Sequence, residues 1–337
     1  MHRAGLVTGR TSLRLNNDLP VAEYVDLVVA AEALGFDQVW VSDDLFLRSA
    51  PVMVTAAAAR TSRIGLGIGI MNPYSVHPAE LAMLAATLQE VSGGRFLLGL
   101  AAGAEEFLGW AGIPRPLPLT RTREAVRAVR ALTRGDRPSD VPGAGEDWTS
   151  EAYLRFPLGA PAPVYVGAMS PKMLQMSGAE AEGVLPLLYP PEHFPVARDL
   201  VHDGARAAGR DPAEVDVAAA FWVSVDDDGA RAERALAEKI AYYGASFSPY
   251  LLSRAGLAVE DFADIQAALS AGEPERATDL VTPEMLRLGI AGDADEVVRR
   301  CRWLQEQGAT HLSFGPPLGP DPVAAVTVLG EQVLPRL

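Results

Sequence analysis

The chain has 337 residues, of which 49% are hydrophobic and 21% charged, and its formal net charge is −14 at pH 7. This composition allows a packed core and argues against disorder. An acidic chain repels nucleic acid and anionic lipid, so we expect neither as a partner. No apolar run approaches the ~20 residues of a membrane span, and the start lacks an apolar stretch of signal-peptide length. A lone cysteine, Cys301, allows no internal disulfide and fits a cytoplasmic location.

Short apolar segments alternate with amphipathic ones along the chain. The apolar segments predict strands at residues 4–8, 38–41, 64–70, 95–100, 163–167, 184–188, 215–224 and 311–314. The amphipathic segments predict helices that include residues 21–34, 78–91, 122–132, 171–181, 196–208 and 322–334. Eight strand–helix repeats predict an α/β fold, a (β/α)8 TIM barrel. A doubly wound sheet shows the same alternation with fewer units and is the structural alternative.

Two segments interrupt this alternation. Residues 135–161, rich in Gly, Pro and Asp, follow the fourth predicted strand, and residues 226–292 separate the seventh from the eighth. The second segment contains several helical patterns. Long insertions after barrel strands usually lie at the C-terminal face, where substrates bind. We therefore expect one domain over residues 1–337, with a helical insertion between strands seven and eight that shapes a pocket.

The ends of the second and third strands carry unusual residues. Asp43 and Asp44 follow the second strand, and because successive strand residues point to opposite faces, at most one of them enters a site. An aspartate that caps the next helix or turn is the alternative. In "GIGIMNPYSVHP", residues 67–78, alternate glycines weaken the strand and Asn72-Pro73 ends it. This pattern indicates a tight corner, a β-bulge beside a site, or close approach of a ligand to the backbone.

The fourth and fifth strands end in small residues. "AAGAE" follows the fourth strand, and Gly167-Ala168 precede Ser170, a favourable N-cap, and Pro171. The helix N-terminus after the fifth strand offers amides and a partial positive charge to a phosphate, although an ordinary capped helix reads the same way. No G-x-S-x-G, Ser/His/Asp order, H-E-x-x-H or zinc-ligand spacing is present. We therefore expect no metal and chemistry that comes from an organic cofactor.

Residues 69–103, "GIMNPYSVHPAELAMLAATLQEVSGGRFLLGLAAG", resemble the signature of the luciferase-like flavin and deazaflavin oxidoreductases. Within that family, "YVGAMSPKMLQMSGAEAEGVL", "GASFSPYLLSRAGL" and "FGPPLGPDPVAAVTVLGEQVL" are most similar to the coenzyme F420-dependent methylenetetrahydromethanopterin reductases. The resemblance runs nearly end to end. It implies a (β/α)8 barrel, F420 as the cofactor with FMN as the alternative, and a homodimer.

The resemblance also implies roles for particular residues. In the family, strand three carries a bulge with a non-prolyl cis peptide against the cofactor ring, which matches Gly69 and Ile70, with Asn72 beside them. The phosphate tail would lie at Ala102, Gly103 and Ala104 and at Gly167, Ala168, Met169 and Ser170, and Gly315 would border the ring. Asp43 or Asp44 would be the catalytic ionisable group. Thr8, Tyr74 and Trp222 would line the substrate pocket. A role for Trp222 in the hydrophobic core is equally consistent with the sequence.

Two departures from the family pattern bear on the reaction. Asp44 stands where the family often has histidine, and Val7 was matched to the glutamate that ends strand one in the methanopterin reductases. Lost proton donors favour a C=N acceptor over a conjugated C=C. The resemblance thus implies an F420-dependent reductase that passes a hydride to a C=N, or a conjugated C=C, bond of a small organic substrate. An FMN-dependent monooxygenase of the same fold and a catalytically inactive ligand-binding barrel are the alternatives.

Overall fold

Strands and helices alternate through residues 9–186 and 189–337, the part of the chain that the computed structural model describes. The strands are β1 Arg10–Leu15, β2 Gln38–Val41, β3 Gly65–Met71, β4 Phe96–Leu100, β5 Val164–Val166, β6 Gly183–Val184, β7 Asp216–Val225, β8 Gly289–Gly292 and β9 His311–Leu318. The helices are α1 Val21–Leu34, α2 Ala50–Ala58, α3 Pro78–Ser92, α4 Glu105–Trp110, α5 Pro118–Arg134, α6 Pro171–Glu180, α7 Phe194–Ala207, α8 Gly229–Tyr243, α9 Pro249–Arg254, α10 Ala263–Ser270, α11 Pro274–Asp279, α12 Pro283–Leu286, α13 Ala294–Glu306 and α14 Pro322–Val328.

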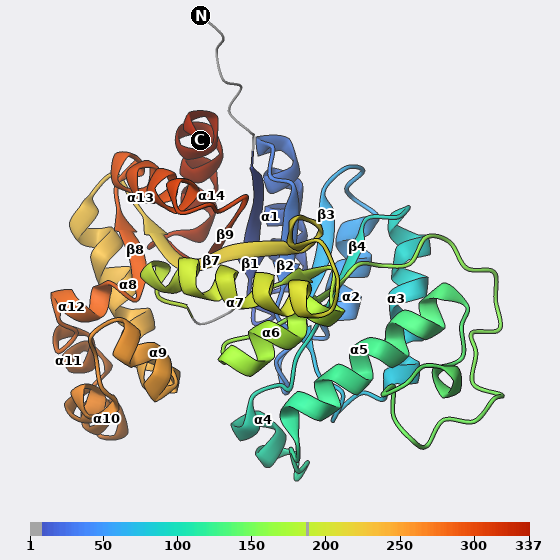
Figure 1. Ribbon diagram of the computed structural model, residues 1–337. Coiled ribbons are helices and arrows are strands. Elements are labelled where there is room, and N and C mark those ends of the chain that lie inside the picture. Colours follow the sequence, from blue (N-terminus) through green and yellow to red (C-terminus); the bar gives the residue numbers. More distant parts are fainter. Residues whose placement is uncertain (1–8, 187–188) are drawn as a thin grey trace, which may run out of the picture.

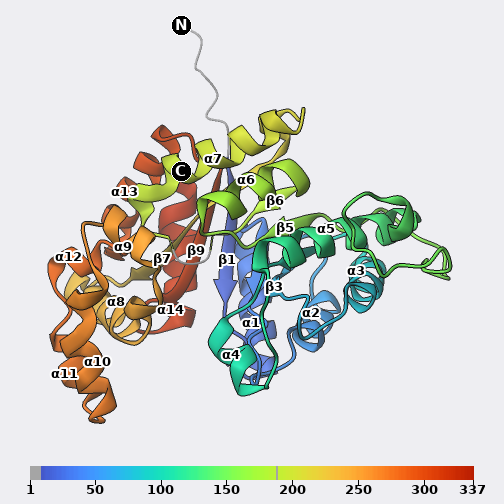
Figure 2. The ribbon, with the colours of Figure 1, turned by 60° about the horizontal axis from the view of Figure 1, so that its bottom comes forward.

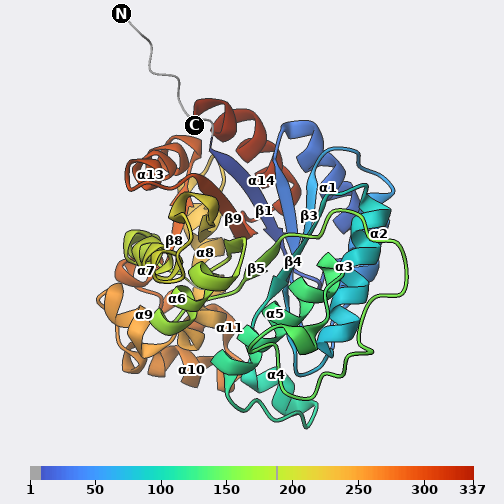
Figure 3. The same cartoon turned by 45° about the vertical axis from the view of Figure 1, so that its right-hand side comes forward.

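Eight parallel strands close into a barrel. Strands β1 to β6 pair in sequence order, β6 pairs with β7, β7 with β9, and β9 with β1. The helices surround the strands (Figures 1 and 3). The predicted (β/α)8 TIM barrel is confirmed, with β9 as its eighth strand. Strand β8 is additional, since it pairs only with the end of β7, residues 222–225.

The first barrel strand lies later in the chain than predicted. The predicted strand at residues 4–8, with Val7 and Thr8, lies outside the described residues, and the barrel begins with β1, "RTSLRL". This strand alternates: Leu13 and Leu15 are buried in the large outer core, whereas Ser12 and Arg14 occupy the other face. The prediction was wrong because it sought a continuous apolar run, and a strand with a polar inner face does not show one.

The other predicted strands differ less from the structure. The sixth is shorter than predicted, with β6 at Gly183–Val184 and residues 187–188 outside the described part, and the eighth extends to Leu318. The predicted insertion, residues 226–292, contains α8 to α12 and β8, and α13 follows it before β9. Residues 135–161 form one 3₁₀ turn, Pro138–Asp140, and otherwise loops. Helix α4 and helices α9 to α11 lie at the lower end of the barrel in Figure 1.

A small second core fills the barrel interior. It contains Trp40, Leu97, Tyr165, Leu185, Ala218 and Ala220, and it is separate from the large core between strands and helices. The rings of Trp40 and Tyr165 pack edge to face at 5.0 Å between centroids. A Cβ atom on Gly67 would collide with the Trp40 indole. One of the alternate glycines of β3 is therefore required by the packing of a large aromatic ring inside the barrel.

A polar network closes the opposite, N-terminal end of the barrel. The Asp216 carboxylate accepts a hydrogen bond from Tyr165 Oη at 2.7 Å and an ion pair from Arg10, and it lies 3.0 Å from His311 Nδ1. His311 Nε2 lies 2.8 Å from Ser12 Oγ. Ser12, His311 and Asp216 thus have the connectivity of a hydrolase triad. Ser12 and His311 are fully buried and the Asp216 side chain is 15% exposed. They lie at the end of the barrel that contributes to stability and does not bind substrate, so we assign them a structural role.

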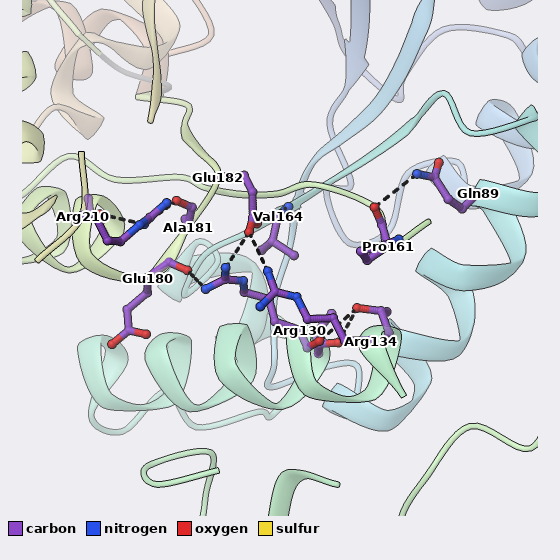
Figure 4. A network of polar contacts seen from close by, with 12 residues as sticks. Gln89, Arg130, Arg134, Pro161, Val164, Glu180, Ala181, Glu182 and Arg210 are labelled. Carbon is purple, nitrogen blue, oxygen red and sulfur yellow. Dashed lines mark hydrogen bonds and ion pairs between the residues drawn. The ribbon is translucent and has the colours of Figure 1, made fainter. Parts of the chain in front are cut away.

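Ion pairs attach α5 to the fifth and sixth strands (Figure 4). The Glu182 carboxylate pairs with Arg130 at 2.6 Å and Arg134 at 3.4 Å, and it accepts the Val164 amide at 3.0 Å. Arg130 also donates to the Glu180 carbonyl oxygen. Because β5 and β6 are short, these contacts fix the loops that position the helix N-terminus after β5.

Candidate active site at the mouth of the barrel

The predicted site residues lie in the C-terminal halves of different strands or in the loops that follow them, and therefore at one mouth of the barrel. Figure 2 turns this end, marked by α4 and by helices α9 to α11, toward the viewer. Thr8 is the exception, because it lies outside the described residues.

Glycines line one side of this mouth. A Cβ atom on Gly99 would lie 3.1 Å from the Gly69 Cα, and one on Gly167 would lie 3.0 Å from Ile70 Cγ2. Below them, a Cβ atom on Gly69 would lie 3.3 Å from the Trp40 indole. Three adjacent strands, β3 to β5, thus bring glycines around the side chain of Ile70, whose Cγ2 atom lies close to both Gly99 and Gly167. We call Gly69, Gly99 and Gly167, with the Ile70 side chain between them, the glycine surface.

Strand β3 is bulged beside this glycine surface. Its pairing with β4 shifts register between Ile68 and Met71, and the Gly69–Ile70 peptide is cis, both as predicted. The Asn72 Oδ1 atom accepts hydrogen bonds from the amides of Tyr74 at 3.1 Å and Ser75 at 2.9 Å. The Asn72 side-chain oxygen therefore holds the loop after β3, and a role toward a cofactor stays a prediction for its amide nitrogen.

The N-terminus of α6 has the features predicted for an anion site. Ser170 is the N-cap and its Oγ accepts the Met173 amide, Pro171 begins the helix, and no acidic residue occupies the first turn. Lys172 lies in that turn. The Gly167 amide already donates to the Leu100 carbonyl at 2.9 Å. Any contact from this segment to a phosphate therefore falls to the residues after Gly167, namely Ala168, Met169 and Ser170.

The segment after β4 is electrostatically different. Ala102, Gly103 and Ala104 precede α4, whose first turn contains Glu105 and Glu106. Arg115 pairs with Glu105 at 2.8 Å and donates to the Gly103 carbonyl at 3.3 Å. Because two carboxylates oppose an anion here, the α6 end is the better phosphate site of the two.

The two aspartates after β2 point in different directions, as the alternation of strand residues predicts. Asp43 Oδ1 accepts the amide of Ala50, the first residue of α2, at 3.3 Å. Burial raises the pKa of Asp43, and the neighbouring Asp44 raises it further. Burial also raises the pKa of Asp44, which Ser42 and the positive charge of Lys239 oppose. Asp43 thus acts as a cap, the alternative left open by the sequence, and Asp44 is the carboxylate that faces the mouth.

Asn17 was not predicted and holds the Asp44 loop. Its side chain is fully buried, and Nδ2 donates to the carbonyl oxygens of Asp44 at 3.0 Å and Arg48 at 2.8 Å. Its Oδ1 accepts from Ser42 Oγ at 2.9 Å. The signal was the pair Asn16-Asn17 after an alternating strand, and it was missed because the first strand was placed too early.

Arg14 of β1 is the second unpredicted residue. Its guanidinium is buried, donates to the Phe221 carbonyl at 2.8 Å, and occupies the space where a Cβ atom on Gly315 would lie. Burial lowers the pKa of Arg14 to about 10. The match of Val7 to the end of strand one is therefore wrong, since the ionisable residue near the end of β1 is Arg14. Gly315 borders this cation from β9.

Lys239 of α8 is the third residue at the mouth that the sequence did not predict. Its Nζ lies 4.1 Å from the Tyr243 ring centroid and 5.8 Å from that of Trp222. Burial lowers the pKa of Lys239 to about 8; Asp18 and Asp44 oppose this shift, and Arg14 adds to it. A group with this pKa can donate a proton near neutral pH. Lys239 is therefore a candidate proton donor that the sequence did not indicate.

The remaining predicted residues have defined contacts. Trp222 is 5% exposed and packs edge to face on Phe247 at 5.3 Å, so it is a core residue at the base of the mouth and one of its walls. The Tyr74 hydroxyl donates to the Pro116 carbonyl at 2.7 Å and remains partly exposed. Residues 9–186 and 189–337 contain no group of three or more His, Cys, Asp or Glu residues able to hold a metal ion. Over the same residues, no helix is both long and apolar enough to cross a membrane.

Comparison with known proteins finds relatives that match nearly the whole chain in sequence and in structure. The family described as luciferase-like monooxygenase matches residues 1–311. A 5,10-methylenetetrahydromethanopterin reductase of Archaeoglobus fulgidus is 34% identical over 95% of this chain and 98% of its own length. An F420-dependent glucose-6-phosphate dehydrogenase of Nakamurella multipartita is 31% identical, over 94% and 92%. The structure of the coenzyme F420-dependent tetrahydromethanopterin reductase of Methanopyrus kandleri superimposes with a TM-score of 0.89 at 31% identity, covering 97% and 99%.

Proposed function

Because the chain belongs to the luciferase-like monooxygenase family, we propose that it is an F420-dependent oxidoreductase that reduces a C=N or conjugated C=C bond of a small organic substrate. The glycine surface on β3 to β5 carries this proposal. In this proposal the cofactor ring packs on the glycine surface, and the α6 N-terminus, with Lys172, which lies after β5, receives the phosphate. The names of the relatives, several of them F420-dependent enzymes, support the choice of cofactor.

The protein's part in the reaction is to position and polarise. When bound, F420 supplies the hydride. Strands β7, β9 and β1 face the glycine surface across the barrel and present Trp222, Gly315 and Arg14. A substrate held between the two sides has one face toward the ring and the other toward these residues. Asp44 stabilises a cationic imine, and Lys239 donates the proton that an alkene acceptor requires.

A titration with F420 and FMN side by side tests the cofactor. We expect F420 to bind with micromolar or tighter affinity and FMN to bind much more weakly, measured by fluorescence. Gly167→Leu places a side chain above Ile70, where the Cβ atom alone approaches to 3.0 Å, so F420 binding should weaken at least tenfold. Gly159→Leu is the matched control, since a Cβ atom there meets no neighbour within 4 Å.

The outcomes separate the alternatives. Equal or tighter binding of FMN contradicts the proposal and favours a flavin monooxygenase. Binding of F420 without turnover of any cyclic imine or enone by the reduced cofactor favours an inactive ligand-binding barrel. Unchanged F420 binding in Gly167→Leu shows that the ring does not lie on the glycine surface.

A further inference from the structure

Two cations meet at the side of the mouth that faces the glycine surface. Arg14 lies in β1 against Gly315 of β9 and donates to the Phe221 carbonyl of β7, and Lys239 reaches the same region from α8 in the insertion. The two charges are near enough for Arg14 to lower the pKa of Lys239. Like charges are brought together in a partly buried place only at a cost, which an anion between them removes.

Lys239 has cation–π contacts but no acceptor in the part of the chain that the structure describes. Its Nζ contacts the rings of Tyr243 and Trp222, and no carboxylate of residues 9–186 or 189–337 forms an ion pair with it. Asp18 and Asp44 raise the pKa of Lys239 without forming an ion pair, and the effect of Asp18 is larger than that of Arg14. Within the described residues, the three ammonium donors of Lys239 thus lack a hydrogen-bond acceptor. They lie beside an aromatic wall that Phe247 completes by packing on Trp222.

The choice of lysine is itself informative. The sequence contains only two lysines, Lys172 and Lys239, among 29 Lys and Arg residues. Lys172 lies in the first turn of α6, where the phosphate is proposed to bind, and Lys239 lies at the mouth. Both lysines of the chain therefore lie at the sites for which we propose an anion.

We propose that Arg14 and Lys239 form a carboxylate-binding subsite, so that the substrate is a small organic anion with an apolar or aromatic body. The carboxylate lies between the guanidinium and the ammonium, and the apolar body lies along Trp222, Tyr243 and Phe247. This inference names the substrate class of the site described under the proposed function. It rests on that function, because only a cofactor ring on the glycine surface gives the reacting carbon of the bound anion a hydride donor to face.

Calorimetric titration of the full chain, with and without F420, tests the subsite. The probes are benzoate and its neutral analogue benzamide. We expect benzoate to bind at least tenfold more tightly than benzamide, and Lys239→Met to weaken benzoate binding at least tenfold. Lys239→Arg, which keeps the charge, should retain binding within about threefold of the wild-type value by the usual spread of single-pair effects. Arg231→Met, an exposed change on the same helix, is the control.

Arg14→Met tests the second cation, with circular dichroism to confirm that the variant is folded. If it is unfolded, the Lys239 variants decide the question alone. Equal binding of benzoate and benzamide, or unchanged benzoate binding in Lys239→Met, overturns the proposal. So does displacement of F420 by benzoate, which would place the anion in the phosphate site. Because the titration is also made without cofactor, failure of F420 to bind contradicts the proposed function and leaves the carboxylate subsite measurable.

Discussion

Replacement of Asp216 by alanine should destabilise the protein by about 2–6 kcal/mol. The carboxylate accepts from Tyr165, His311 and Arg10. The His311 side chain is fully buried and the Tyr165 residue is 3% exposed, so neither donor can turn to water, whereas the Arg10 side chain is 43% exposed and can. Two buried donors without acceptors cost about 1–3 kcal/mol each, a large part of a typical stability of about 5–15 kcal/mol. Urea unfolding at pH 7, followed by circular dichroism, measures the loss.

The same network predicts a pH dependence. Burial alone would raise the pKa of Asp216, but His311, Arg10 and Tyr165 together hold it well below its usual range. The unfolded chain therefore binds more protons near pH 4, and the stability that Asp216 contributes is present above that pH and lost as the pH falls. The decrease in the free energy of unfolding between neutral and acidic pH should be smaller in Asp216→Asn than in the wild type. A free energy of unfolding for Asp216→Ala within about 1 kcal/mol of the wild-type value would refute this account of the network.

Three further predictions concern the mouth. Gly67→Ala should lower the free energy of unfolding by about 1–3 kcal/mol, because the added Cβ atom collides with the Trp40 ring. In Gly69→Ala the added Cβ atom lies 3.3 Å from the same ring, so this variant should keep its stability and bind F420 more weakly. Urea unfolding and fluorescence titration measure the two effects. Benzoate binding should fall as the pH rises through about 8, where Lys239 loses its proton, and a flat calorimetric pH profile would contradict this. Asn17→Ala should cost about 1–3 kcal/mol in urea unfolding, since it removes the acceptor of one hydroxyl and the donors to two carbonyls.

The sequence predicted the barrel because its outer core repeats. Strands such as β2 and β4 are buried along their whole length and read as short apolar runs. The same rule failed for β1, where the residues that face the barrel interior are Ser12 and Arg14. A window on the sequence cannot recognise polar residues as part of the barrel interior, because their partners lie hundreds of residues away. Ser12 and His311, 299 positions apart, are the clearest case.

The mouth was predicted unevenly for the same reason. Glycines and proline steps are local signals, and they led to Gly69, Asn72, Gly167 and Ser170, whose placements at strand ends the structure supports. The choice between Asp43 and Asp44 needed the position of α2, which takes Asp43 as a hydrogen-bond acceptor for Ala50. A carboxylate becomes a cap or a candidate catalytic group according to the helix that packs beside it, and the pair of letters alone does not contain that information.

The mouth cations show how a departure from a family pattern becomes interpretable once the strand is placed correctly. With the first strand at residues 4–8, the absence of a glutamate at Val7 signified only a lost acid. With β1 at Arg10–Leu15, the same end of the strand carries Arg14, and the ammonium of Lys239 adds a second positive charge. A strand end that carries an arginine where the family pattern has an acid favours a ligand of the opposite charge. The chain's net charge of −14 makes this local reversal more selective, because an organic anion is repelled elsewhere on the surface and held where Arg14 and Lys239 converge.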